Sequence, residues 1–112
     1  MTNRELIDRL KQAHNIGFDL DIAVIFGLSK QQINDWTQEK RPIPIQMKFR
    51  ILALTNFPNT MEFAAVFVDT KQLAEDLKKD RKAIERLHAM AKKADELLEH
   101  DEKQRTASKS TK

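Results

Sequence analysis

The chain has no cysteine, only two glycines and three prolines among its 112 residues, and aromatic residues make up 6% of it. The lack of cysteine excludes disulfides, thiol catalysis and thiolate metal sites, and it suits a reducing compartment. So few glycine, proline and aromatic residues argue against a β-sandwich or barrel. Apolar residues make up 40% of the chain, which is enough for a small helical core. We therefore expect an all-α protein.

Long hydrophobic runs are also lacking. The longest uninterrupted apolar run covers residues 63–68, far short of the roughly 20 residues that a transmembrane helix needs. The N-terminus does not have the basic-then-apolar order of a secretory signal peptide. The sequence therefore predicts a soluble, cytoplasmic protein with no membrane partner.

Signatures of enzymes are missing as well. Glycine occurs only at positions 17 and 27, which leaves no phosphate-binding loop and no dinucleotide fingerprint. No serine stands in the sequence context of a nucleophile elbow. The three histidines, His14, His88 and His100, are scattered along the chain. We predict that the protein is not an enzyme and that it uses neither a cofactor nor a metal.

The most informative stretch covers residues 19–44. Apolar residues fill most of the segment 20–26, which predicts a short buried helix. Gly27 follows, and glycine enters the left-handed conformation at a helix end without a steric penalty. Ser29 begins a second helix, where Gln32 completes a capping box three residues later. A helix, a glycine turn and a capped helix form the order of a helix-turn-helix motif.

The second helix of this motif has two distinct faces. Ile33 and Trp36 are expected to face the core, together with the small Ala23 at the point where the two helices cross. The side chains left on the outer face are those of Lys30, Gln31, Asn34 and Asp35. Long amides and a positive charge near a helix N-terminus are the groups that read base edges and phosphates in the major groove. The sequence therefore predicts a recognition helix at 29–38.

This segment resembles the Cro and phage-repressor class of helix-turn-helix DNA-binding proteins, the XRE-like class. The usual run of that class is matched here by Ala23, Gly27, Leu28, Ser29, Ile33 and Trp36. The resemblance covers residues 4–56, about half of the chain. It implies a small five-helix lambda-repressor-like domain, which we assign to residues 1–68.

The class often has glycine shortly after the second helix, where this chain has Glu39 or Lys40. A left-handed cap without glycine costs on the order of 1 kcal/mol. Either this cap is strained or the helix exits differently.

The resemblance also implies roles for individual residues. The expected DNA-binding residues are Ser29, Lys30, Gln31, Gln32, Asn34, Asp35, Lys40 and Arg41. Gln31 suits the N6 and N7 edge of adenine, and Lys30 suits the O6 and N7 edge of guanine. Asp35 would accept a hydrogen bond from the amino group of cytosine. Lys40 and Arg41 would neutralise phosphates in the loop after the recognition helix.

The pattern changes after residue 59. A fifth helix over residues 60–68 is apolar nearly all round, so it must be covered on several sides. Residues 69–103 then follow a heptad pattern and predict a long amphipathic helix that forms a dimer. The expected dimerisation residues are Leu73, Leu77, Ile84, Leu87, Ala91, Ala94 and Leu98.

The sequence leaves two questions about this C-terminal region undecided, and the last residues do not follow the heptad pattern. The helix that begins at residue 60 either breaks at residues 69–70 or passes through them. Asp80 lies in the expected seam, where it either opens the pairing locally or pairs with Arg81 of the partner subunit. Residues 104–112 have no apolar periodicity, and we expect them to be disordered.

The net charge of +3, from 20 basic and 17 acidic residues, is only a weak sign of nucleic-acid binding. The placement of the polar residues carries more weight. We expect a sequence-specific transcriptional regulator, similar to a phage or prophage repressor, that binds a palindromic operator as a homodimer. The alternative is an antitoxin or anti-activator whose C-terminal helix binds a protein partner.

Overall fold

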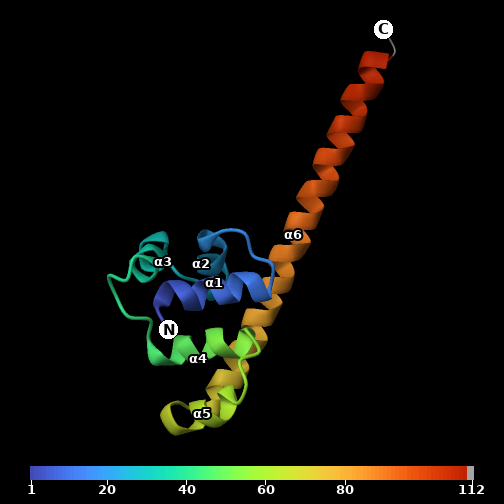
Figure 1. Cartoon of the computed structure of the whole chain (residues 1–112). Coiled ribbons are helices and arrows are strands. Elements are labelled where there is room, and N and C mark those ends of the chain that lie inside the picture. The colour runs from blue at the N-terminus through green and yellow to red at the C-terminus, as the bar shows by residue number, and fades with distance from the viewer. Residues whose placement is uncertain (111–112) are drawn as a thin grey trace.

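A computed structural model describes the backbone of residues 1–110 and the side-chain surroundings of residues 1–99. Over these residues the chain is all-α, as expected, and Figure 1 shows a cluster of short helices beside one long helix. The helices are α1 (Asn3–Ala13), α2 (Asp19–Phe26), α3 (Lys30–Thr37), α4 (Ile45–Leu54), α5 (Thr60–Phe67) and α6 (Thr70–Ser110). No helix in this described part combines the length and the apolar character that crossing a membrane requires.

The turn between α2 and α3 has the geometry that the sequence predicts. Gly27 ends α2 with φ 67° and ψ 35°, in the left-handed region. Both halves of the capping box are present at the start of α3. The Gln32 backbone N–H donates to Ser29 Oγ (3.1 Å), and the Ser29 backbone N–H donates to Gln32 Oε1 (2.9 Å). Local chemistry thus sets where α2 ends and where α3 begins.

The core lies where the short helices meet. Ile7 of α1, Ile22 of α2, Ile33 of α3 and Ile51 of α4 are completely buried there, and each such side chain contributes roughly 1.5–3 kcal/mol through removal from water. The three residues expected to face inward, Ala23, Ile33 and Trp36, are all buried. Burial of one side of α3 leaves its opposite side turned toward solvent.

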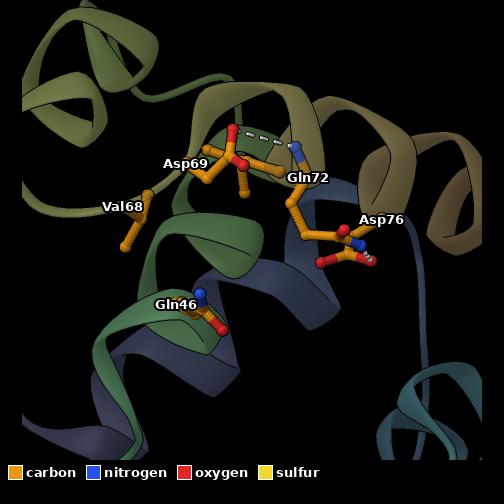
Figure 2. A pocket seen from close by; sticks show the side chains of 6 residues that line it. Gln46, Val68, Asp69, Gln72 and Asp76 are labelled. Carbon is orange, nitrogen blue, oxygen red and sulfur yellow. Dashed lines mark hydrogen bonds between the residues drawn. The ribbon is translucent and has the colours of Figure 1, made fainter.

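A break separates α5 from α6, which answers the question of continuity at residues 69–70. Val68 adopts an extended conformation, and Asp69 caps the next helix by accepting from the backbone N–H of Lys71 at 2.9 Å. Figure 2 shows this turn beside a small pocket. The pocket is lined by Gln46, Val68, Asp69, Gln72, Leu73 and Asp76. The Gln72 amide donates to Asp76 Oδ1 (3.1 Å) one turn further along α6.

The first half of α6 packs on the domain and contacts α2, α4 and α5. Leu73, Leu77 and Ile84, which we expected in a dimer seam, instead lie buried in the core of their own chain. The first half of α6 thus adds a layer to the core that the short helices form. The core therefore continues across residue 68, where we had placed a domain boundary.

Asp80 is also committed within its own chain. Its carboxylate accepts two hydrogen bonds from Arg50 of α4, from Nη2 at 2.6 Å and from Nε at 3.0 Å. The guanidinium carbon lies 5.1 Å from the centre of the Phe26 ring, in cation–π contact. The partner of Asp80 is therefore Arg50 of its own chain, and not the Arg81 of a second subunit that the heptad pattern suggested.

The second half of α6 extends away from the other helices (Figure 1). Residues 88–99 are all exposed, and among the expected dimerisation residues this group includes Ala91, Ala94 and Leu98, whereas Leu87 is half-buried at the edge of the core. The helix continues to Ser110, whereas we expected disorder from residue 104. Residues 111 and 112 of that expected tail lie outside the described residues.

Candidate functional site

The expected DNA-binding residues lie together on one surface of the molecule. They belong to α3, to its N-terminal cap and to the loop that follows it, and α3 makes no contact with α6. Ser29, Lys30, Gln31 and Gln32 are exposed. Figure 1 shows α3 at the edge of the helical cluster, on the side away from the long helix. The polar face of α3 is thus accessible at its N-terminal end, whereas Asn34 and Asp35 further along are only partly exposed.

Asp35 stands at the centre of a small polar network on this surface. Its Oδ1 accepts a hydrogen bond from Gln31 Nε2 at 2.8 Å, and its Oδ2 pairs with Arg41 Nε at 3.5 Å. Its backbone carbonyl accepts from the N–H groups of Lys40 (2.8 Å) and Arg41 (3.3 Å). Only 13% of the Asp35 side chain is exposed, against 77% for Arg41. Asp35 therefore joins the polar face of α3 to the cationic loop.

The exit from α3 explains why this chain lacks the expected glycine. Glu39 adopts the left-handed conformation, with φ 59°, at a cost on the order of 1 kcal/mol. Its carboxylate accepts from the backbone N–H groups of Arg4 (3.0 Å) and Asn3 (3.4 Å), which are free donors in the first turn of α1. A carboxylate at this end of a helix is stabilising. Glycine would remove the strain, but it would also leave α1 without this contact.

Asn3 completes the attachment of the loop. Its side-chain amide donates to the backbone carbonyl of Arg41 at 2.8 Å, so α1 holds the segment that carries Lys40 and Arg41. An open hollow lined by Asn3, Glu39, Lys40, Arg41 and Pro42 lies at this junction. Sequence reasoning did not single out Asn3 or Glu39 as residues that support the site. A non-glycine residue at a left-handed cap was the available sign of a second role.

Charges on the neighbouring surface are largely neutralised by ion pairs. Arg4 and Lys11 of α1 donate to the Asp19 carboxylate at 2.8 and 2.9 Å. Burial opposes the ionisation of Asp19, but the hydrogen bonds from Arg4 and Lys11 outweigh it and hold the pKa of this carboxyl below its ordinary value. These two cations are therefore engaged in joining α1 to α2. Lys30, Lys40 and Arg41 are the cations that stand out on the α3 side.

The histidines do not gather at this surface. His14 Nε2 lies 2.6 Å from the backbone carbonyl oxygen of Leu54 and ties the end of α1 to the end of α4. His88 is exposed on α6, and the side chain of His100 lies outside the described residues. Among the described residues, no group of three or more histidine, aspartate or glutamate side chains is placed to hold a metal ion.

Comparison with protein families, with characterised proteins and with solved structures finds no match for this chain. The geometry of the α3 surface and the chemistry of its side chains are therefore the features that indicate a function.

Proposed function

We propose that the protein is a sequence-specific DNA-binding transcriptional regulator of the Cro and phage-repressor helix-turn-helix type. In this proposal α2 and α3 form the motif, and α3 is the recognition helix. One observation carries it: Ile33 and Trp36 anchor one side of α3 in the core, while Lys30 and Gln31 on the other side face solvent. Such a helix is held rigidly and offers donors and acceptors to a base edge.

The dimensions and charges of this surface suit a DNA groove. An α-helix with its side chains is about 10–12 Å in diameter, and the major groove, about 12 Å wide, admits it. Lys40 and Arg41 follow the helix on an exposed loop, where they can neutralise phosphates. Ser29 and the free N–H groups at the start of α3 offer a further phosphate contact.

Homodimer formation through the second half of α6 is part of the proposal. Met90, Leu97 and Leu98 are exposed there, and with Ala91 and Ala94 they follow the helical spacing of a single stripe. A second copy of the helix would cover this stripe. Two recognition helices related by a two-fold axis would then read the two halves of a palindromic operator.

The alternative is an antitoxin or anti-activator that binds another protein, and one observation favours it. We expected α5 to be covered on several sides, yet Phe63, Val66 and Phe67 are 58%, 77% and 61% exposed. Contiguous exposed apolar side chains mark interaction sites in soluble proteins. A protein partner could cover α5, the distal half of α6, or both.

Selection of bound duplexes from a random DNA library at physiological salt tests the main proposal. We expect a two-fold symmetric motif, whose two halves are separated by one helical turn or a multiple of it. Gln31→Ala should weaken binding by about 1–3 kcal/mol at one position in each half, whereas Arg41→Ala should weaken all sequences alike and reduce the salt dependence. Failure to enrich any sequence would refute the proposal.

Size measurement of the purified protein by light scattering separates the two functions. A stable dimer at micromolar concentration supports the regulator. A monomer that dimerises neither alone nor on DNA would leave the alternative, in which a different protein binds the exposed stripe.

A further inference from the structure

The carboxylate of Asp35 is occupied on both of its oxygens. Oδ1 accepts from Gln31 Nε2, and Oδ2 pairs with Arg41 Nε. The side chain is also largely covered, with 13% of its surface exposed. A base that approaches α3 would meet Gln31 and Arg41 before it reached these oxygens. Direct recognition of a cytosine amino group by Asp35, which the sequence suggests, would have to use an oxygen that already contacts Gln31 or Arg41, on a side chain that is mostly covered.

The contact between Gln31 and Asp35 also orients the Gln31 amide. An ionised carboxylate only accepts hydrogen bonds, so the amide must turn its nitrogen, and not its oxygen, toward Asp35. One of the two N–H groups is used in this bond, and the second N–H and the carbonyl oxygen remain for a ligand. A donor beside an acceptor is the pair that adenine requires, at N7 and at its N6 amino group. Guanine presents two acceptors, O6 and N7, and would face the Gln31 carbonyl unfavourably.

The second carboxylate oxygen of Asp35, Oδ2, contacts the loop that carries Lys40 and Arg41. The ion pair with Asp35 uses Nε of Arg41, which leaves the two terminal nitrogens of the guanidinium available for a phosphate. The backbone N–H groups of Lys40 and Arg41 bond to the Asp35 carbonyl and hold the loop from the same residue. The negative charge of Asp35, which would otherwise repel DNA, is thereby balanced.

We propose that Asp35 is a positioning residue that fixes the Gln31 amide for adenine and places Arg41 toward the DNA backbone, rather than a residue that reads a base. This inference rests on the proposed DNA-binding function. It assigns adenine as the base opposite Gln31, and it makes preference for adenine over guanine at that position depend on a residue that does not touch the base.

A double-mutant cycle on the selected operator tests the inference. Gln31→Ala identifies the operator position that Gln31 reads. Asp35→Ala should lose most of the adenine preference at that same position, a change of about 5- to 100-fold, and should leave the other positions unchanged. Because the two residues act as one unit, the double variant should be no worse at that position than Gln31→Ala alone. Glu75→Ala on α6 is a control for the change in charge, since it is exposed and lies on a helix that does not contact α3.

Asp35→Asn separates the two functions of the carboxylate. Its amide oxygen can still accept from Gln31, so the preference for adenine should be retained. Asparagine has no charge to pair with Arg41, so the Arg41 side chain should no longer be held in place. The affinity for DNA should therefore fall equally for all sequences. Circular dichroism of each variant establishes that the helices are intact.

Three outcomes overturn the inference. Both Asp35 variants could lose a preference for cytosine at an operator position other than the one that Gln31 reads. If this loss in binding free energy added to that of Gln31→Ala, Asp35 would be a residue that reads a base. Equal adenine preference in the wild type and in Asp35→Ala would remove the positioning role while leaving the proposed function standing. Absence of any specific binding by the wild type would end both. A DNA-free measurement reports on the contact itself. The Gln31 side-chain N–H proton that bonds to Asp35 should have an NMR shift displaced from its value in free glutamine, and the shift should return toward that value in Asp35→Ala. A shift that is the same in the wild type and in Asp35→Ala would count against the contact.

Discussion

The ion pair between Arg50 and Asp80 should hold α6 on the domain, and replacement of Asp80 by alanine tests this directly. Asp80 is 1% exposed, and the Arg50 side chain is 19% exposed. Removal of one partner of a fully buried pair costs about 3–5 kcal/mol, because the other charge stays buried without compensation. Arg50 retains some access to water, so we expect the loss for Asp80→Ala to be about 2–4 kcal/mol. This is a large part of the roughly 5–15 kcal/mol that stabilises a small domain.

Urea unfolding followed by far-UV circular dichroism measures this loss. Several protein concentrations are needed, because formation of a dimer would add a concentration-dependent contribution to stability. Glu75→Ala is a matched control, since Glu75 also lies on the first half of α6 but is exposed. We expect the control to change the free energy of unfolding by less than about 1 kcal/mol.

The double variant Arg50→Met with Asp80→Leu separates the pair from the packing around it. Apolar residues in place of both charges remove the desolvation cost together with the attraction, so stability should return to within about 1 kcal/mol of the wild type. Burial raises the pKa of Asp80 although the bonds from Arg50 oppose it, which agrees with a substantial cost of burying this charge. A loss below about 1 kcal/mol for Asp80→Ala, or a double variant as unstable as the single one, would refute the reasoning.

Substitutions at the surface of the core and on the second half of α6 test three other contacts. Glu39→Ala should be less stable than Glu39→Gly in urea unfolding, with a free energy of unfolding lower by about 1 kcal/mol. Both variants lose the contact with α1, but alanine keeps the strain of the left-handed conformation. Equal free energies of unfolding would contradict this. The pKa of Asp19 is below its ordinary value, so its contribution is present at neutral pH and is lost as pH falls through that lowered pKa. The free energy of unfolding of Asp19→Asn should therefore fall less steeply than that of the wild type below about pH 4. The same fall in both proteins would count against this role of Asp19. Leu97→Lys with Leu98→Lys should abolish the proposed dimer in light scattering and leave the melting of the core almost unchanged. A dimer that persists in this variant would exclude the exposed stripe on the second half of α6 as its interface.

Features set by neighbouring residues could be predicted from the sequence. Gly27, the Ser29–Gln32 capping box and the burial of Ile33 and Trp36 all depend on spacings of a few residues, and the structure confirms each of them. The exit from α3 was foreseen as a problem, but its solution was not. The donors that Glu39 reaches lie on α1, 35 and 36 residues away in the chain, and no local pattern indicates them.

The role of α6 could not be read from its sequence for a related reason. An apolar stripe on a helix requires a partner surface, but the pattern is the same whether that surface belongs to the same chain or to another. Leu73, Leu77 and Ile84 therefore appeared to belong to a dimer. Asp80 likewise revealed only that it needed a cation, and Arg50 lies 30 residues earlier. Gln31 and Asp35 are four residues apart on one helix, a spacing that favours mutual contact, although we assigned each of them to a separate base.

The absence of glycine and proline between residues 70 and 110 gives α6 the character of a stiff lever. Its first half is packed in the core through Leu73, Leu77 and Ile84, whereas residues 88–99 are exposed. A rotation imposed at Leu97 would therefore pass along one continuous helix to its contacts with α2 and α4. Each residue of an α-helix advances the phase by about 100°. One extra residue inserted after Leu87 would therefore rotate the exposed stripe of the second half of α6 to another side of the molecule. Three or four extra residues would nearly restore its orientation, one turn further along the helix.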